Sequence, residues 1–184
     1  MPFSNPFRKT EPLLQDNSAA ETFADPAARE LLTEQAIEQL TAHITHSETR
    51  HTGDIRICIE HTLPESYRQR QASARERAVM QFAKLRVWDT EHNNGILIYI
   101  LLEPHAIEIV ADRGYNRCVA QNTWQDITDR LRERFQQHDY LQGLSQALDR
   151  ITDTMAQCYP ADPAHVRTEN LPNAPVILDP ASKR

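Results

Sequence analysis

The stretch WDTEHNNGILIYILLE, residues 88–103, decides the fold of this sequence. Its second half contains the longest apolar run of the chain, Ile96–Leu102, which is apolar at both alternating sets of positions. A strand of this composition is buried on both faces, so it is predicted to lie at the centre of a sheet. Its first half, Asp89–Asn94, combines acids, a histidine and amides, which is typical of a turn and equally of a metal or acid/base site.

Two more strands are predicted beside this central strand. Residues 54–61 alternate isoleucine with other side chains, and this period of two is typical of a strand. Residues 106–112 follow the central strand after a short turn and are predicted to return as an antiparallel hairpin. A helix is predicted over 67–85, between the first two strands, so these strands should run parallel with a right-handed crossover.

Apolar residues at helical spacing predict the remaining helices. One begins at Asp25 and Pro26, as N-cap and first helical residue, and two follow the hairpin, with stripes that start at Trp124 and Leu141. The predicted order is α-β-α-β-β-α-α. The fold class is therefore α/β, a small mixed β-sheet (a βαβ unit plus an antiparallel hairpin) with helices covering its faces.

The chain is predicted to form one domain between two polar ends. Residues 1–24 are expected to be a flexible N-terminal arm, residues 25–159 the domain, and residues 160–184 a C-terminal tail with five prolines. The tail contains a short apolar motif, Val176–Leu178, which is expected to dock either on the domain or on a partner.

Composition limits the classes of function. The 184 residues carry a formal net charge of −6, which argues against non-specific nucleic-acid binding because that needs clustered Lys and Arg. No apolar run approaches the ~18 residues of a membrane span, and the N-terminus has no apolar segment typical of a secretory signal. Three cysteines without CxxC spacing fit a reducing compartment, so a cytoplasmic location is expected.

Motifs for nucleotide binding, for serine-hydrolase chemistry and for zinc binding on a helix are absent from the sequence. His43, His46 and His51 lie close together, but without a cysteine or paired acids nearby they favour a solvated helix end over a metal site. Cys58 has only Arg56 beside it on the same strand face, so an inert thiol is favoured over a catalytic thiolate.

Acidic and amide residues at one end of the hairpin form the strongest candidate site. Asp89, Asn93 and Asn94 precede the central strand, and Asp112 follows the third strand. An antiparallel hairpin brings these two places to the same end of the sheet. Hard oxygen ligands of this kind suit Ca²⁺ or Mg²⁺. Turns use the same residue types, so a metal site and a plain turn both stay open.

Parts of the sequence resemble the TPM-domain family. They are RVWDTEHNNGILIYILLEPHAIEIVADRGYN (residues 86–116), Trp124, and RFQQHDYLQGLSQALDRI (residues 134–151). The family pattern has an NNG turn before an apolar strand, and an F-x-x-[GH]-D-[YF]-x-x-G step into the last helix. The resemblance covers about residues 30–160. It implies a fold with a small sheet between helices.

Members of this family include a plant thylakoid-lumen acid phosphatase and bacterial proteins often encoded beside LemA-type membrane proteins. The resemblance therefore implies phosphomonoester hydrolysis, calcium binding in an acidic cleft, and a LemA-type protein as partner. Asp89, Asn93, Asn94 and Asp112 match positions near that cleft. The chain lacks the signal peptide and membrane anchor of many members, so it looks like a short cytoplasmic branch.

Two hypotheses about function follow. The favoured one is a non-catalytic binding or adaptor module for a membrane-associated complex, because no nucleophile–base pair is recognisable in the sequence. The other is a divalent-metal-dependent phosphatase, in which Asp89 and Asp112 hold an ion that polarises phosphate and lowers the pKa of a bound water. His92 would then be the general acid, since histidine titrates near neutral pH.

Overall fold

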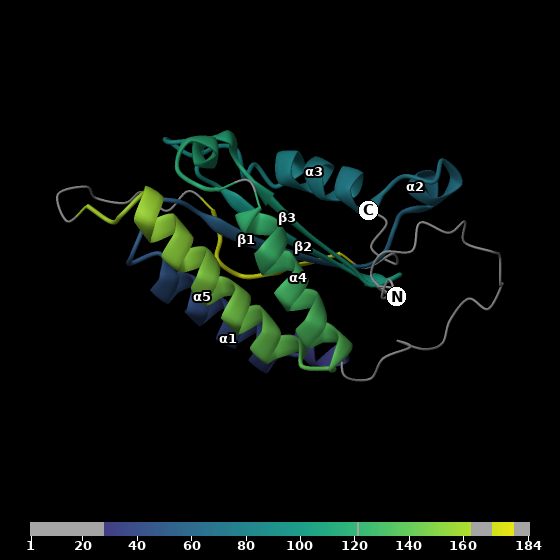
Figure 1. Cartoon of the computed structure of the whole chain (residues 1–184). Helices are drawn as coiled ribbons and strands as arrows, with labels where there is room; N and C mark the ends of the chain where they lie inside the picture. Colours follow the sequence, from purple (N-terminus) through teal and green to yellow (C-terminus); the bar gives the residue numbers. More distant parts are fainter. Residues whose placement is uncertain (1–27, 121, 163–170, 179–184) are drawn as a thin grey trace, which may run out of the picture.

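The computed structural model describes residues 28–120, 122–162 and 171–178. It contains a mixed β-sheet with helices on both of its faces (Figure 1), which confirms the predicted α/β fold class. Along the chain the elements are η1 (Ala28–Leu32), α1 (Glu34–Ser47), β1 (Ile55–Thr62), α2 (Glu65–Gln69), α3 (Ala74–Lys84), β2 (Ile96–Glu103), β3 (Ala106–Ala111), η2 (Arg113–Arg117), α4 (Thr123–Gln136), α5 (Tyr140–Cys158) and β4 (Val176–Leu178).

Strand β2 lies inside the sheet, as its apolar run predicts, in the strand order β3-β2-β1-β4. It pairs parallel with β1, with Ile57 opposite Ile98, and antiparallel with β3, with Ile98 opposite Ile109. Every residue of Ile96–Leu102 is buried. The burial follows from position, because both neighbouring edges of β2 are paired and helices cover both of its faces.

Each face of the sheet has its own apolar core. The isoleucine face of β1, β2 and β3 packs against α1, α4 and α5, which lie together on one side of the sheet (Figure 1). The opposite face packs against α3, and this second core contains Cys58, Tyr99 and Val110. The predicted arrangement of helices on both faces is therefore confirmed.

Two predicted helices begin or end differently in the structure. The single helix predicted over 67–85 is two helices, α2 and α3, because Ser73 starts a new helix by accepting a hydrogen bond from the backbone N–H of Glu76 at 3.1 Å. In the same way Thr33 is the N-cap of α1 and accepts from the N–H of Ala36 at 3.2 Å. The predicted start at Asp25 and Pro26 lies outside the described residues.

The C-terminal tail contributes a strand to the sheet. Val176–Leu178 forms β4, which runs parallel to β1 with Cys58 opposite Val176. The sheet therefore has four strands, where the sequence predicted three and left open whether this motif docks on the domain or on a partner. The boundaries of the arm, domain and tail stay predictions.

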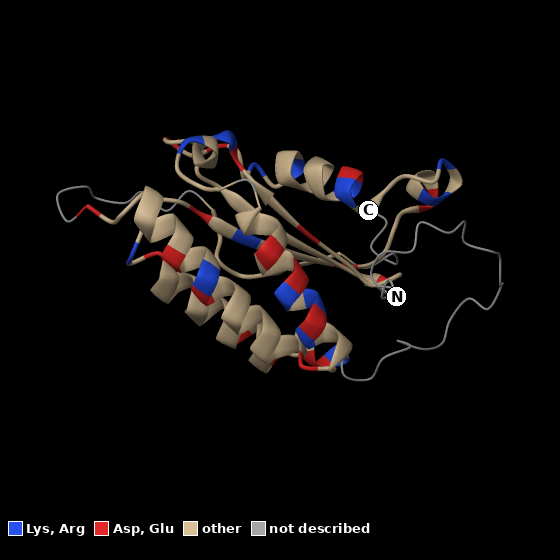
Figure 2. Ribbon diagram, viewed as in Figure 1, with Lys and Arg blue, Asp and Glu red and all other residues tan. Residues whose placement is uncertain are grey.

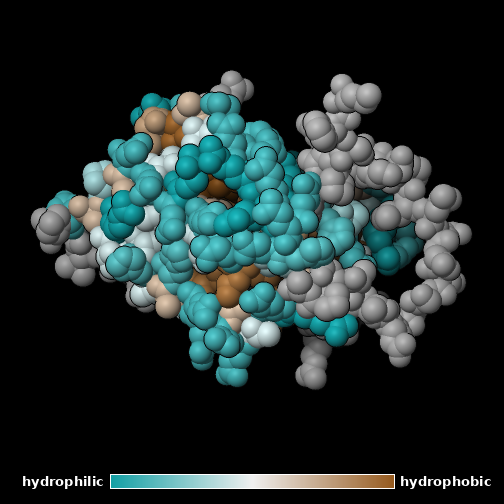
Figure 3. Space-filling model, turned by 60° about the horizontal axis from the view of Figure 1, so that its bottom comes forward, coloured by the Kyte–Doolittle hydropathy of each residue, from teal (hydrophilic) through white to brown (hydrophobic). Residues whose placement is uncertain are grey.

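Polar side chains cover the outer faces of the helices. Acidic and basic residues are interspersed along α4 and α5 (Figure 2), and the face shown in Figure 3 is mainly hydrophilic with small apolar patches. Within the described ranges, the helices are too short or too polar to cross a membrane.

Two arginines cap the outer edge of β3. Arg132 of α4 donates from Nη2 to the carbonyl oxygen of Ile107 at 2.9 Å, and Arg75 donates from Nη1 to that of Ile109 at 2.6 Å. In an antiparallel pair, residues that exchange backbone hydrogen bonds with the neighbouring strand alternate with residues that do not. Ile107 and Ile109 belong to the second kind, so their carbonyl oxygens point away from β2. Charged side chains at an edge strand hinder pairing with another chain.

A buried ion pair crosses the second core. The Arg77 guanidinium on α3 donates to both carboxylate oxygens of Glu60 on β1, from Nε at 2.8 Å and from Nη2 at 2.5 Å. The Tyr99 hydroxyl donates to the same carboxylate at 2.6 Å. Burial raises the pKa of Tyr99, and its hydrogen bond to Glu60 raises it further, so the phenol stays protonated. The charges of this network are paired, which buried charges require.

Replacing one partner of this network tests how much the fold depends on it. Arg77→Ala leaves the Glu60 carboxylate buried without its cation, so we expect the free energy of unfolding to fall by about 3–5 kcal/mol. Urea denaturation of the variant against the unmodified chain measures the loss.

The matched control is Arg68→Ala on α2. Arg68 pairs with Glu65 at the exposed surface, so its loss should leave the urea midpoint nearly unchanged because exposed pairs contribute about 0–1 kcal/mol. Equal destabilisation by both substitutions would contradict a special role for the buried pair.

Candidate functional site

Three segments meet at one end of the sheet, where β1 and β2 begin and β3 ends. We call residues 52–54, 93–95 and 112–115 the loop cluster. The N–H of Asp112 donates to the carbonyl oxygen of Gly95 at 3.0 Å, and that of Gly114 donates to the carbonyl oxygen of Asn93 at 2.9 Å. The backbone carbonyl oxygen of Asp54 accepts from the N–H of Ile96 at 2.9 Å. The convergence expected from hairpin geometry is therefore present in the backbone.

Local backbone constraints place the NNG turn. Asn93 has a φ of 51°, a left-handed conformation that asparagine tolerates better than most residues. A Cβ atom on Gly95 would lie 1.9 Å from the carbonyl oxygen of Val87. Only glycine therefore allows the chain to pass Val87 and enter β2.

Two of the predicted ligands are held by arginines. Asn93 accepts at Oδ1 from Nη2 of Arg113 at 3.1 Å and from its Nε at 3.3 Å. Asp89 accepts at Oδ2 from Nη2 of Arg86 at 2.5 Å, on the exposed surface. These side chains act in this structure as turn and surface residues, one of the two alternatives left open by the sequence.

The other two predicted ligands retain an unpartnered oxygen. Asn94 is 1% exposed, and its Nδ2 donates to Oγ1 of Thr52 at 3.3 Å, while its Oδ1 has no hydrogen-bond partner in the described part of the chain. Asp112 accepts at Oδ1 from the N–H of Arg113 at 2.7 Å, and its buried Oδ2 also lacks a partner among the described residues. Buried acceptors without donors are costly and mark places where a ligand can supply the missing contact.

The chemistry of these oxygens limits what they can hold. An amide and a carboxylate oxygen fit a hard cation such as Ca²⁺ or Mg²⁺, which completes its shell with backbone carbonyls and water. Within the described ranges there is no group of three or more His, Cys, Asp or Glu side chains placed to hold a metal ion. Asn94 and Asp112 are therefore the residues of the predicted set that fit such an ion best.

His92, the predicted general acid, is exposed and stacks on the ring of Tyr159, with ring centroids 6.1 Å apart and planes inclined by 8°. In the described part of the chain, no hydrogen bond joins its ring to a hydroxyl or thiol. A catalytic role for His92 stays a prediction.

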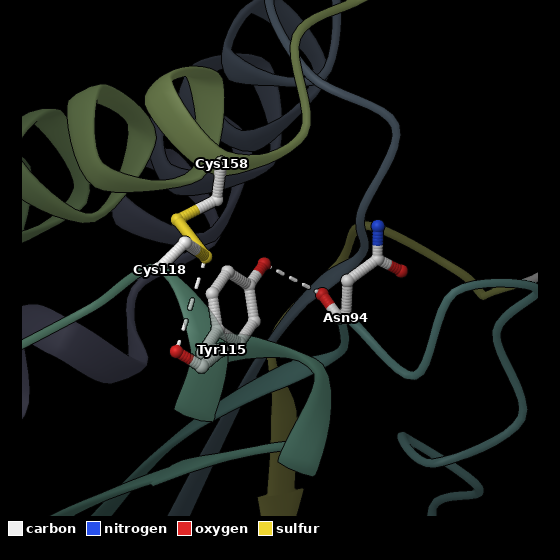
Figure 4. The surroundings of a disulfide bond; sticks show 4 residues. All are labelled: Asn94, Tyr115, Cys118 and Cys158. Carbon is white, nitrogen blue, oxygen red and sulfur yellow. Dashed lines mark hydrogen bonds between the residues drawn. A yellow bond between two sulfur atoms is a disulfide. The ribbon is translucent and has the colours of Figure 1, made fainter.

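A disulfide links the end of η2, just after the loop cluster, to the end of helix α5. Cys118 and Cys158 are bonded across 40 residues, with a Cα–Cα distance of 5.8 Å (Figure 4). The sequence, read as fitting a reducing compartment, did not predict this disulfide, because its two cysteines lie far apart in the chain and only tertiary structure brings them together. The bond fixes the segment after η2 to α5.

Tyr115 connects that segment to the NNG turn. Its hydroxyl donates to the carbonyl oxygen of Asn94 at 2.8 Å, while the Asn94 side chain points away from it (Figure 4). Burial raises the pKa of Tyr115, so the hydroxyl remains a donor. The disulfide and this hydrogen bond together hold η2 against the start of β2.

A Ser–His pair that the sequence did not indicate lies in the interior, next to residues 52–54 of the loop cluster. Oγ of Ser47 is 2.9 Å from Nε2 of His51 and 2.6 Å from Oγ1 of Thr152, and Nδ1 of His51 donates to the carbonyl oxygen of Gly53 at 3.0 Å. Ser47 and His51 are both 1% exposed, so this pair fixes Gly53 rather than meeting a substrate. The solvated helix end predicted for the three histidines is wrong for His51.

Known proteins match the chain as follows. The family model of the TPM domain matches residues 26–154. A comparison with curated proteins finds no match. Among solved structures, the chain is similar to the NMR structure of the BA42 protein from the psychrophilic bacterium Bizionia argentinensis sp. nov., with a TM-score of 0.69 and 24% identity over 79% of this chain and 94% of that chain. This similarity supports the fold.

Cys58 offers a test of whether the second core is closed to reagents. Burial raises the pKa of its thiol to about 12, and the nearby charge of Glu60 adds to the shift. At pH 9.0, the thiol's ordinary value, we expect iodoacetamide to leave Cys58 unmodified in the folded, non-reduced protein and to modify it in urea. Mass spectrometry of the tryptic peptides measures this.

The same shift predicts a pH dependence of stability. Below pH 9.0 the thiol is protonated in both states, so its burial contributes fully to the free energy of unfolding. Between pH 9.0 and about 12 only the unfolded thiol ionises, so this contribution is lost as the pH rises. The free energy of unfolding of Cys58→Ala should therefore fall less over that pH window than that of the unmodified chain. Rapid alkylation of Cys58 in the folded protein would contradict its buried position.

Proposed function

Because the chain belongs to the TPM-domain family, we propose that it is a non-catalytic binding module whose binding surface is the loop cluster. The observation that carries the proposal is the pair of unpartnered oxygens, Oδ1 of Asn94 and Oδ2 of Asp112. A divalent cation, Ca²⁺ or Mg²⁺, would take these two oxygens and tie the start of β2 to the end of β3. A partner protein would dock on the loops ordered in this way.

The nucleophiles and proton donors of the described structure favour binding over hydrolysis. Ser47 and His51 form a pair but lie in the interior. Cys58 is buried with a raised pKa, so it is a poor nucleophile near neutral pH. His92 stacks on Tyr159 instead of facing a hydroxyl. These placements support a module that binds without forming or breaking bonds.

A divalent-metal-dependent phosphatase acting on phosphomonoesters is the second candidate, and Arg113 is the observation that favours it. Its exposed guanidinium donates to Oδ1 of Asn93, and its backbone N–H donates to Oδ1 of Asp112. Guanidinium groups bind phosphate oxygens in two-point contacts. The cation would polarise the phosphate and lower the pKa of a bound water. In this chain Asn94 and Asp112 would hold the ion, Arg113 would orient the phosphate, and His92 would donate the proton.

The partner and the location are part of the proposal. The resemblance to proteins encoded beside LemA-type membrane proteins supports a LemA-type protein in a membrane-associated complex. The proposed cytoplasmic location rested partly on three cysteines without CxxC spacing, which fit a reducing compartment. The bond between Cys118 and Cys158 removes that support, because disulfides persist mainly in oxidising compartments.

Thermal unfolding with and without Ca²⁺, Mg²⁺ and Mn²⁺ tests the cation site. At a concentration 100 times the dissociation constant, a cation that binds only the folded chain stabilises it by about 2.7 kcal/mol. We expect Asp112→Asn to abolish this stabilisation, because it removes the carboxylate charge while keeping the size of the side chain. The control Asp89→Asn alters a carboxylate already paired with Arg86 and should keep the full shift.

An assay with p-nitrophenyl phosphate separates the two functions. The binding module predicts stabilisation by a cation without turnover above that of Asp112→Asn. Turnover that depends on both the cation and Asp112 would establish the phosphatase instead. No shift with any of the three ions would contradict the cation site itself.

A further inference from the structure

The bond between Cys118 and Cys158 can be reached from solvent at one of its two sulfur atoms. Cys118 is exposed just after η2, whereas Cys158 is half-buried at the last residue of α5. Exposed disulfides are reduced most readily, since a thiolate must reach one sulfur atom to break the bond. The third cysteine, Cys58, is buried in the second core and cannot exchange with this bond in the folded chain.

The two apolar cores are built without this bond. Cys118 belongs to neither core, and Cys158 is only partly buried where it packs against the first core. The three strands β1, β2 and β3 and the helices that cover them contact one another through other side chains. Breaking the bond should therefore leave the sheet folded and act mainly on the segment that follows β3.

Tyr159, the residue after Cys158, touches the loop cluster in several places. Its carbonyl oxygen accepts from the N–H of Thr52 at 3.0 Å. Its ring lies edge-on to that of Tyr115, with ring centroids 5.3 Å apart, and stacks on that of His92 just before the NNG turn. The end of α5 therefore contacts the loops before β1, before β2 and after β3 through this one residue.

At the other end of the bond, η2 is held to the NNG turn by few contacts. It is a short 3-10 helix, and its Tyr115 hydroxyl donates to the carbonyl oxygen of Asn94 (Figure 4). The N–H of Gly114 donates to the carbonyl oxygen of Asn93 at 2.9 Å. A segment with few such contacts opens locally at low cost once a covalent constraint is removed.

We propose that the Cys118–Cys158 bond is a redox switch on the loop cluster. In the oxidised chain, the bond fixes η2 against α5, so the oxygens of Asn94 and Asp112 stay in place. Reduction releases η2, loosens the loop cluster and lowers its affinity for the divalent cation. The change in affinity rests on the proposed function, whereas the release of η2 needs no cation.

The reductant is a dithiol. One of its thiolates attacks Sγ of Cys118, the S–S bond breaks, and Cys158 leaves as a thiolate that takes up a proton. The second thiol of the reductant then attacks the mixed disulfide and releases Cys118 as a thiol. Two electrons and two protons pass to the chain, and the dithiol becomes a disulfide.

Hydrogen exchange of the ¹⁵N-labelled full chain in EDTA measures the release of η2 before and after reduction with dithiothreitol. We expect the amides of Thr52 and Gly114 to exchange about tenfold faster in the reduced chain, because local opening becomes more frequent. The amides of Ile96–Leu102 in β2 should keep their protection. Oxidised glutathione should restore slow exchange at Thr52 and Gly114.

Matched variants separate the bond from other effects of the reductant. The double variant Cys118→Ser/Cys158→Ser should show fast exchange at Thr52 and Gly114 without dithiothreitol and no further change with it. Cys58→Ala retains the bond and should respond to dithiothreitol as the unmodified chain does. If the double variant does not fold, the reversible reduction of the unmodified chain decides.

Calcium titrations of the oxidised and the reduced chain test the consequence for the cation site. The affinity should be about tenfold lower in the reduced chain, if the form that binds is then populated about a tenth of the time. Equal affinity would overturn control of cation binding by the bond. Calcium binding to neither form would contradict the proposed function, and the exchange measurement would still decide whether η2 is released.

Three results would overturn the switch. In the first, dithiothreitol does not make Cys118 and Cys158 available to iodoacetamide in the folded chain, as measured by mass spectrometry of the peptides. In the second, the bond is reduced but exchange at Thr52 and Gly114 does not change. In the third, β2 loses its protection as well, so that the whole fold depends on the bond.

Discussion

Burial of β2 on both faces is the constraint on which the rest of the structure depends. Alternate residues of this strand need an apolar partner above and below the sheet, so α3 covers one face and α1, α4 and α5 cover the other. When a strand is covered on both faces, polar side chains and backbone groups can reach solvent only at its two ends. The loop cluster forms at one of these ends because Gly95 lets the polar turn pass within contact of Val87 and enter the sheet directly.

The charged network of the second core and the polar side chains at the rim of the sheet differ in their hydrogen bonding. The Glu60 carboxylate receives hydrogen bonds from Arg77 and Tyr99, so the charge in the second core is fully paired. At the rim, Asn94 and Asp112 each keep an oxygen without a donor although both loops are held in place by hydrogen bonds and a disulfide. Both amide atoms of Gln81, buried on α3, also lack a partner in the described ranges, so an unpartnered atom alone does not mark a site. The rim differs because two such oxygens come from two loops that meet there, and natural proteins leave polar groups unsatisfied mainly at functional sites.

The sequence predicts features that local pattern encodes. The period of two gave the strands, and hairpin geometry gave the meeting of the NNG turn with Asp112. The stripe over 67–85 concealed the break at Ser73, because apolar spacing continues across a new N-cap. The pairing of Cys118 with Cys158 and the docking of Val176–Leu178 depend on tertiary contacts that no local pattern records. The sequence predicted Asp89 as a metal ligand, whereas in the structure its carboxylate pairs with Arg86.

An NMR titration of the ¹⁵N-labelled full chain with Ca²⁺ tests the central claim most directly, that the loop cluster is the binding surface. The account predicts amide shift changes at residues 93–95 and 112–115, with the side-chain amide of Asn94 among them. Changes confined to exposed acids elsewhere, such as Asp149 or Asp153 on α5, with none at Asn94 or Asp112, would contradict it.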